Sequence, residues 1–285
     1  MAHEGRTVIR IGDVWDSATA VLAGRAGLLL PIALLAFLLP AVAQAAMTAY
    51  ASESKGVTAV GAVLSIVALL ATLWGQLATV AVASDPQTTR AQASAAATAR
   101  LPSAVLVTLV LVAAAIIAVL PILAALWSTG FDFRAAASVQ PGSAGGPSVS
   151  FGAALFTFFY GLILFVGGLW LTARLALLNP VILNERRGIG AIGRSMQLTR
   201  GLTWRLTGVI LLFLIALGVS SYAAQRVVFV IVRLLLGAEQ ASTAALMGMV
   251  ASAAVTAAFT TVASVFAARL FAAVTAVREP VVFAK

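Results

Sequence analysis

The chain has 285 residues, of which 62% are hydrophobic and only 9% are charged, and its formal net charge is +9. About a quarter of the residues of a typical soluble domain are charged, so this composition excludes an ordinary soluble domain. The chain has no cysteine, which excludes disulfide bonds, a thiolate nucleophile and cysteine metal ligands.

Six long stretches of the chain contain no charged residue. Each holds ~20 or more mostly apolar residues, which at 1.5 Å per residue is enough to cross a hydrocarbon core of about 30 Å. We therefore predict an all-α, polytopic membrane protein, a single domain over residues 1–285, whose six transmembrane helices form three hairpins. The predicted spans are residues 27–49, 58–83, 102–127, 151–178, 206–232 and 243–275.

An amphipathic segment precedes the first span. Residues 11–22 place Val14, Trp15 and Ala18 on one face of a helix. Such a helix either lies on the membrane surface or packs on the ends of the spans, and the sequence leaves both open. The Ala-Val-Ala sequence at 41–43 resembles a signal-peptide cleavage site. The polar region before the apolar run is too long for a signal peptide, so we interpret the run as the first span.

Two further amphipathic segments indicate an internal triplication. Residues 88–100 have a mostly alanine face, and Asp85-Pro86 is a plausible start for this helix. Residues 189–200 place four less polar side chains on one face, and serine occupies a corresponding place in all three segments. These residues are Ile189, Ile192, Met196 and Thr199 for the face, and Ser17, Ser94 and Ser195 for the serines.

We therefore predict three pseudo-repeats, residues 9–83, 86–178 and 186–275, each an amphipathic cytoplasmic helix followed by a hairpin. The units are expected to lie side by side in a pseudo-threefold arrangement. Residues 128–150, rich in glycine, proline and serine, predict an irregular extracytoplasmic loop.

The string from Arg174 to Arg205 has a recognisable order: an arginine at the end of a span, a proline, a glutamate, an Ala-x-x-x-Ser helix, Leu-Thr and Trp-Arg. This order resembles the membrane domain of glycerophosphoryl diester phosphodiesterases and related bacterial integral membrane proteins of uncharacterised function. The resemblance implies a membrane architecture. The catalytic barrel of those enzymes uses histidines and metal-binding carboxylates. This chain has a single histidine, His3, and we expect no room for a second domain, so their activity is not carried over. The matching residues are Arg174, Pro180, Glu185, Ala191, Ser195, Leu198, Thr199, Trp204 and Arg205.

The residues of this string also predict a polar cluster without the resemblance. Asn179-Pro180 is predicted to end the fourth span, because proline disfavours helix in the preceding residue. Gly201 is predicted to end the amphipathic helix in a left-handed conformation. We expect a structural clasp of Arg174, Glu185 and Arg205, in which Glu185 pairs with Arg174 or a neighbouring arginine. The alternative is a lipid-phosphate pocket, since arginine offers paired donors to phosphate. Candidates for either role are Arg174, Glu185, Arg186, Arg187, Arg194, Arg200 and Arg205.

The charge distribution predicts the orientation in the membrane. All but four of the 18 Lys and Arg residues fall on one side of the predicted spans, so both termini are expected in the cytoplasm. The arginine-rich, alanine-rich composition suggests a bacterial inner membrane. Contact with anionic headgroups explains the basic charge better than nucleic-acid binding does. The four exceptions are Lys55, Arg134, Arg226 and Arg233.

The spans contain uncharged polar residues and no acidic residue well inside them. The lack of acids argues against a proton relay. Gln44, Gln76 and Gln225 are expected to bond between helices. A stripe of small residues that includes Gly248 and Thr256 predicts that the sixth span is the most buried one.

Several catalytic patterns are absent from the sequence. It has no phosphate-binding loop, and with His3 as its single histidine it cannot form a His-Glu-x-x-His site or a plausible triad. We therefore expect no catalysis, no cofactor and no metal. The favoured function is that of a membrane protein that organises lipids or serves as an accessory subunit of a membrane complex. The alternative is a permease or flippase for a lipid or an amphipathic solute, because transporters are often built from repeats.

Overall fold

Long apolar helices make up most of the computed structural model, which describes residues 10–50, 55–133, 150–237 and 240–278. About 90% of the described residues are helical and none of them forms a strand. Six helical segments are long and apolar enough to cross a membrane, which confirms the predicted all-α class and six candidate spans. The elements are α1 (Ile11–Gly24), α2 (Ala26–Ile32), η1 (Ala33–Leu38), α3 (Leu39–Tyr50), α4 (Lys55–Ser84), α5 (Arg90–Ser128), α7 (Phe151–Arg174), α8 (Leu178–Asn184), α9 (Gly190–Leu198), α10 (Thr203–Leu236) and α11 (Ala241–Arg278).

The first span is not a regular α-helix. It runs through α2, the π-helical segment η1 and α3. Proline lacks an N–H, and its ring clashes with the carbonyl four residues earlier in an α-helix. Pro40 would therefore meet the carbonyl of Ala36, which lies within η1. The wider π-helical turn relieves this clash.

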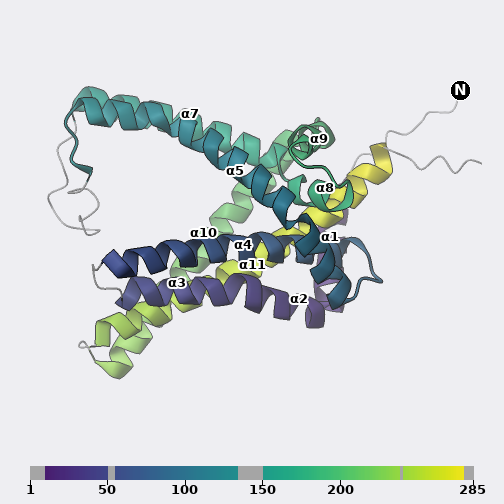
Figure 1. The fold of residues 1–285 in the computed structure, drawn as a ribbon, viewed down its shortest axis with the longest axis horizontal. Coiled ribbons are helices and arrows are strands. Elements are labelled where there is room, and N and C mark those ends of the chain that lie inside the picture. Colours follow the sequence, from purple (N-terminus) through teal and green to yellow (C-terminus); the bar gives the residue numbers. More distant parts are fainter. Residues whose placement is uncertain (1–9, 51–54, 134–149, 238–239, 279–285) are drawn as a thin grey trace, which may run out of the picture.

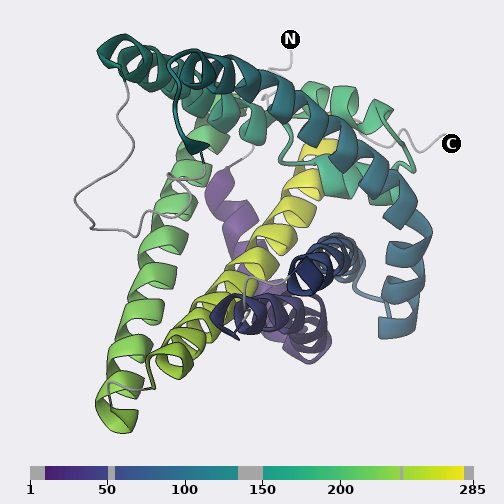
Figure 2. The same ribbon diagram turned by 60° about the vertical axis from the view of Figure 1, so that its left-hand side comes forward.

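The second amphipathic segment is continuous with the third span instead of forming a separate helix. α5 starts after Thr89, which forms a capping box with Gln92, so the start predicted at Asp85-Pro86 is too early. Pro102 lies inside α5 and removes one backbone hydrogen bond without ending the helix. α5 bends along its length (Figure 2), and a proline is a common cause of such a bend.

The long helix of the fourth span ends earlier than predicted, and the short helix α8 continues the span to Asn184. α7 stops at Arg174, and Pro180 is the third residue of the short helix α8. The prediction that Asn179-Pro180 ends the span is wrong, because proline is tolerated in the first turn of a helix, where its missing N–H has no intrahelical partner. Gly201 has a φ angle of +87°, which confirms the predicted left-handed residue after α9.

The helices pack closely at one end and separate at the other (Figure 1). We call the end that carries α1, α8 and α9 the hub, and the opposite end the splayed end. In α5 and in the span made by α7 and α8, only 6% and 0% of the most apolar 18-residue windows are buried. Large side chains buried in the hub come from several helices and include Leu77, Val82, Leu177, Ile182, Leu198, Leu206, Val265 and Val274.

The most buried span is α4 and not the predicted sixth span. The buried share of the most apolar window is 56% for α4 and 22% for α11. α11 contacts α1, η1, α3, α4, α8 and α10, but its small-residue stripe is used unevenly. Gly248 is buried against α10, whereas Ser252 and Thr256 line a groove.

Consecutive spans are in contact within each predicted repeat: η1 and α3 with α4, α5 with α7, and α10 with α11. Each amphipathic segment buries two residues that are four positions apart. When the three segments are superposed on these buried pairs, the three serines do not fall at the same position. The equivalence of the three units therefore stays a prediction. Residues 134–149 of the predicted loop lie outside the described residues. The buried pairs are Val14 and Ala18, Ala93 and Ala97, and Ala191 and Ser195.

Candidate functional site

The hydroxyl groups of α9 satisfy the end of α7. The last carbonyls of an α-helix lack partners within the helix. The carbonyl of Arg174 accepts hydrogen bonds from Ser195 Oγ at 2.9 Å and from Thr199 Oγ1 at 3.1 Å. Ser195 and Thr199 are both fully buried. These two residues of the family-like pattern therefore attach α9 to the fourth span.

The buried face of α9 differs from the predicted one. Ile189 was expected on the apolar face but is 52% exposed. Of the other residues expected there, Thr199 is buried and Ile192 and Met196 are half-buried, but Ala191, Ser195 and Leu198 are buried as well. Polar residues belong to the contact face because they bond the end of α7, which apolar periodicity alone does not reveal.

The side chain of Arg174 bonds back to α9. Its Nη1 donates to the carbonyl of Met196 at 3.0 Å, and its guanidinium lies 5.2 Å from the centre of the Trp170 ring. Arg174 and α9 thus exchange hydrogen bonds in both directions. This arrangement commits much of the Arg174 side chain to structure.

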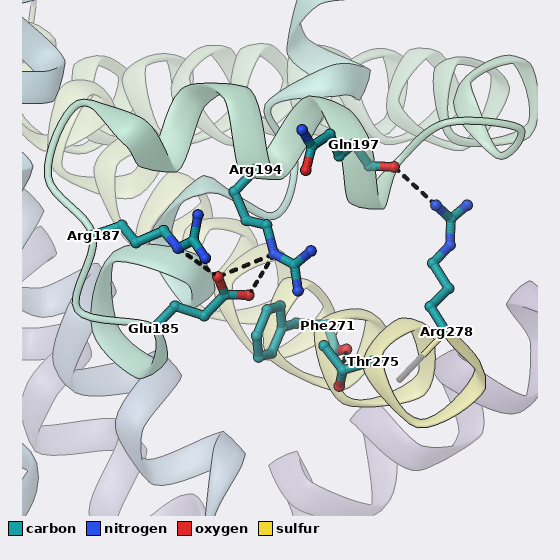
Figure 3. Close-up of polar contacts among 7 residues, drawn as sticks. All are labelled: Glu185, Arg187, Arg194, Gln197, Phe271, Thr275 and Arg278. Carbon is teal, nitrogen blue, oxygen red and sulfur yellow. Dashed lines mark hydrogen bonds and ion pairs between the residues drawn. The ribbon is translucent and has the colours of Figure 1, made fainter. Parts of the chain in front are cut away.

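Glu185 pairs with two neighbouring arginines, which is the second of the two predicted alternatives, and not with Arg174. Arg194 Nε lies 2.9 Å and 3.0 Å from the two carboxylate oxygens, and Arg187 Nε lies 3.0 Å from one of them (Figure 3). The Glu185 and Arg194 side chains are 19% and 16% exposed, and Arg187 is 54% exposed. The expected clasp of Arg174, Glu185 and Arg205 is therefore wrong in its pairing: Arg205 is exposed at the start of α10.

Arg278, in the last turn of α11, joins this cluster without having been predicted. Its Nη1 donates to the carbonyl of Gln197 at 2.8 Å, and its Nη2 donates to the carbonyl of Arg200 (Figure 3). With Arg174, it places two positive groups at the C-terminal end of α9, where the helix dipole is negative. The sequence does show a basic residue just after a predicted span, but it does not show which carbonyls this residue bonds.

A second arginine that sequence reasoning missed closes the other side of the hub. Arg25, between α1 and α2, donates to the carbonyls of Val82, Asp85, Pro86 and Thr88, with lengths of 2.8 Å to Asp85, 2.6 Å to Pro86 and 3.0 Å to Thr88. These carbonyls lie at the end of α4 and in the turn after it. Arg25 therefore fixes the start of the first hairpin to its end.

A third connection attaches α1 to the last helix. Arg269 Nε donates to Ser17 Oγ at 2.6 Å, and the Trp15 and Phe266 rings lie 6.2 Å apart. α1 is thus packed on α11, with Val14 and Ala18 buried. This contact favours the packed alternative for the first amphipathic helix.

The remaining candidates divide into buried and exposed residues. Pro180 is buried in α8, and Ala191 and Leu198 are buried in α9. Trp204 is 78% exposed at the start of α10. Four arginines of the candidate set are also exposed, and Arg186 has a φ angle of +55°. We call these four the exposed arginines: Arg186, Arg187, Arg200 and Arg205.

Two of the chemical expectations concern metals and cofactors. Among the described residues, no group of three or more His, Asp or Glu side chains could hold a metal ion. His3 lies outside the described residues. The absence of a cofactor and of catalysis remains a prediction from the sequence.

No family model, curated protein or solved structure matches the chain. The likeness of the string from Arg174 to Arg205 to phosphodiesterase membrane domains therefore stays a prediction.

Proposed function

We propose that the chain is a non-catalytic integral membrane protein that organises anionic lipids at its hub, either alone or as an accessory subunit of a membrane complex. The observation that carries this proposal is the division of the arginines. Arg25, Arg174 and Arg278 donate to backbone carbonyls and Arg187 pairs with Glu185, whereas the side chains of Arg186, Arg200 and Arg205 bond no other described residue and lie at the surface with Trp204. Exposed basic and tryptophan side chains are typical of the headgroup region.

A cavity at the hub supports the binding of a phosphate headgroup. Its volume is about 430 Å³, and both Arg100 and Arg186 line it. Gln87 and Asn184 add amide donors, and Asp85 is the acidic residue of the lining. Two guanidinium groups suit a phosphate because each presents several donors in one plane.

We propose that the hub faces the cytoplasm of a bacterial cell and that the spans cross its inner membrane. The excess of arginine on this side supports the orientation. The exposed apolar surface of α5 and α7 supports contact with lipid or with a membrane partner over much of their length. A partner on that surface would make the chain an accessory subunit.

Gentle extraction followed by mass spectrometry of retained lipids and proteins tests this proposal. We expect the wild-type protein to retain anionic phospholipid. A variant with Arg186, Arg187, Arg200 and Arg205 changed to alanine should lose most of it. A matched control is the Arg226→Ala, Arg233→Ala variant, whose changes lie in α10 toward the splayed end. Equal retention by the three proteins contradicts the proposal, and a stoichiometric protein partner favours the accessory-subunit form.

A second candidate function is movement of a lipid or amphipathic solute across the membrane. The observation that favours it is a groove between the spans that uncharged polar side chains line. Reconstituted vesicles with a fluorescent phospholipid would show protein-dependent scrambling if this function is correct. Scrambling no faster than in protein-free vesicles eliminates it.

A further inference from the structure

A polar groove lies among η1, α3, α4, α10 and α11, away from the exposed arginines. Its volume is about 430 Å³, and no charged residue lines it. Apolar residues such as Phe37 and Met249 form the rest of its wall. The groove therefore has a mixed character that is unusual for the middle of a membrane protein. Its polar lining includes Gln44, Thr48, Thr72, Gln225, Ser252 and Thr256.

The positions of the lining residues along the spans place the groove between the middle of the spans and the splayed end. Thr72 precedes the end of α4 at Ser84 by about 18 Å, and Gln44 follows Ala26 by about 27 Å, at 1.5 Å per residue. The groove thus extends from the middle of the spans toward the splayed end. At this depth a polar group that lacks a partner is costly.

The polar residues differ in how they are satisfied. Thr256 Oγ1 donates to the carbonyl of Ser252 at 2.9 Å, and Thr260 Oγ1 donates to the carbonyl of Thr256 at 2.8 Å. These hydroxyls keep their own helix as acceptor. The side-chain amides of Gln44 and Gln225 bond no other described residue, although both line the groove. The groove therefore presents two amides that can both donate and accept.

Two close helix contacts hold the walls of the groove. A Cβ atom on Gly248 would lie 2.7 Å from the carbonyl oxygen of Gln225, and one on Gly75 would lie 2.4 Å from the Cβ of Ala36. Only glycine allows these approaches. The second contact seats η1 against α4, and π-helical segments often occur at functional sites.

We propose that this groove binds the uncharged, hydroxyl-bearing headgroup of a lipid such as a diacylglycerol. The amides of Gln44 and Gln225 exchange hydrogen bonds with the hydroxyl and ester groups. The acyl chains lie along the apolar part of the groove wall, for example Phe37 and Met249. An anionic headgroup is excluded because no cation lines the groove and burial of an unpaired charge is costly.

Native mass spectrometry of the purified full chain tests the proposal, with dioleoylglycerol as the probe and dioleoylphosphatidylglycerol as the anionic comparison. The Gln44→Leu, Gln225→Leu variant keeps the approximate volume of the side chains but removes both amides. We expect it to bind dioleoylglycerol about tenfold more weakly than the wild type, from the usual strength of hydrogen bonds in membranes. The matched control is Gln197→Leu, the same change at the exposed Gln197 of α9 (Figure 3).

A second variant separates loss of binding from loss of folding. Ala253→Leu fills the groove but leaves both amides in place, and it should also weaken dioleoylglycerol binding. Thermal unfolding of each variant in detergent shows whether the fold is intact. The proposal is overturned if wild-type protein does not bind dioleoylglycerol, or if a folded groove variant binds it as the wild type does. Tighter groove binding of dioleoylphosphatidylglycerol would overturn the neutral class of ligand. This site is away from the exposed arginines, so a negative result here does not contradict anionic lipid binding at the hub, and the reverse also holds.

Discussion

The two ends of the molecule use arginine in opposite ways. At the hub, Arg25 and Arg278 bond backbone carbonyls that belong to other helices or to turns between them. Toward the splayed end, Arg226 lies 5.2 Å from the ring centre of Tyr222, and Arg233 lies 5.9 Å from that of Phe229. Each of these rings is four residues earlier on the same helix. Arginine side chains therefore connect separate segments at the hub. Toward the splayed end they contact only aromatic rings of their own helix.

This difference indicates that the contacts that stabilise the fold are concentrated at the hub. At the hub, apolar packing and hydrogen bonds to carbonyls act on the same helices. At the splayed end the apolar side chains are exposed, so removing one of them leaves no cavity inside the chain. Substitutions at the two ends should therefore differ strongly in their effect on the free energy of unfolding.

The largest effect is expected for Arg25→Ala. The change removes all hydrogen bonds from this side chain to the carbonyls after α4 and leaves partly buried acceptors without a donor. We expect a loss of about 3 kcal/mol, since hydrogen bonds to charged groups contribute about 1.5–3 kcal/mol. Thermal unfolding in detergent measures it, with exposed Arg205→Ala as control. Similar unfolding temperatures for the two variants would refute the role given to Arg25.

A matched pair of leucines compares the two ends directly. Leu177 is fully buried at the hub, whereas Leu162 of α7 is 49% exposed. Leu177→Ala should cost about 2 kcal/mol through lost packing and a cavity, and Leu162→Ala less than about 0.5 kcal/mol. Urea or detergent titration of both variants checks this. Equal losses would mean that a partner or a second packed state covers α7.

The attachment of α9 is tested by the Ser195→Ala, Thr199→Val variant. It removes both hydroxyl donors from the partly buried carbonyl of Arg174 and should cost about 1–3 kcal/mol, the usual penalty for a polar group left without a partner. Thr172→Val is the control, because the Thr172 hydroxyl bonds only the carbonyl of Gly168 in its own helix. Hydrogen exchange of α9 should accelerate in the double variant alone. Unchanged exchange would show that packing suffices to hold α9.

The smallest expected losses of stability are those for removing either arginine partner of Glu185, and the two losses should differ. Arg194→Ala should cost about 1 kcal/mol, because this ion pair is mostly shielded from water, and Arg187→Ala less than about 0.5 kcal/mol, as is usual for exposed pairs. Unfolding at low and high salt measures both. A larger loss for Arg187→Ala would mean that the exposed pair is the stronger one.

The spans were predictable because each is a local property of the chain. Exclusion of charge over twenty or more residues does not depend on what the helix contacts. The helix ends were less predictable, since the proline at position 102 lies inside a helix and the proline at position 180 lies in the first turn of one. A proline ends a helix only if the carbonyl four residues earlier cannot avoid the proline ring and do without its N–H partner. The local sequence does not show whether it can.

The polar cluster was predicted in its members but not in its pairing. Glu185, Arg174 and Ser195 do lie at adjacent helix ends, yet Glu185 selects Arg194 over Arg174. Several arginines are near Glu185 in the sequence. The conformation of the turn between α8 and α9 determines which of them lies within ion-pair distance of its carboxylate. Arg25 and Arg278 were missed because their acceptors are backbone carbonyls, which every residue possesses.

The connections of the hub also constrain the order of events during synthesis. Arg25 must wait for residues 82–88 to leave the ribosome, and Ser17 must wait for Arg269, which is 252 residues later. The first hairpin is complete when residues 82–88 emerge, but the connection of α1 to Arg269 has to wait for the third hairpin. Insertion is therefore expected to come first, with assembly of the hub following as a separate step among helices already in the membrane. Until the last helix emerges, the carbonyls at the end of α9 lack Arg278 and the nascent chain has an open hub that a chaperone could recognise.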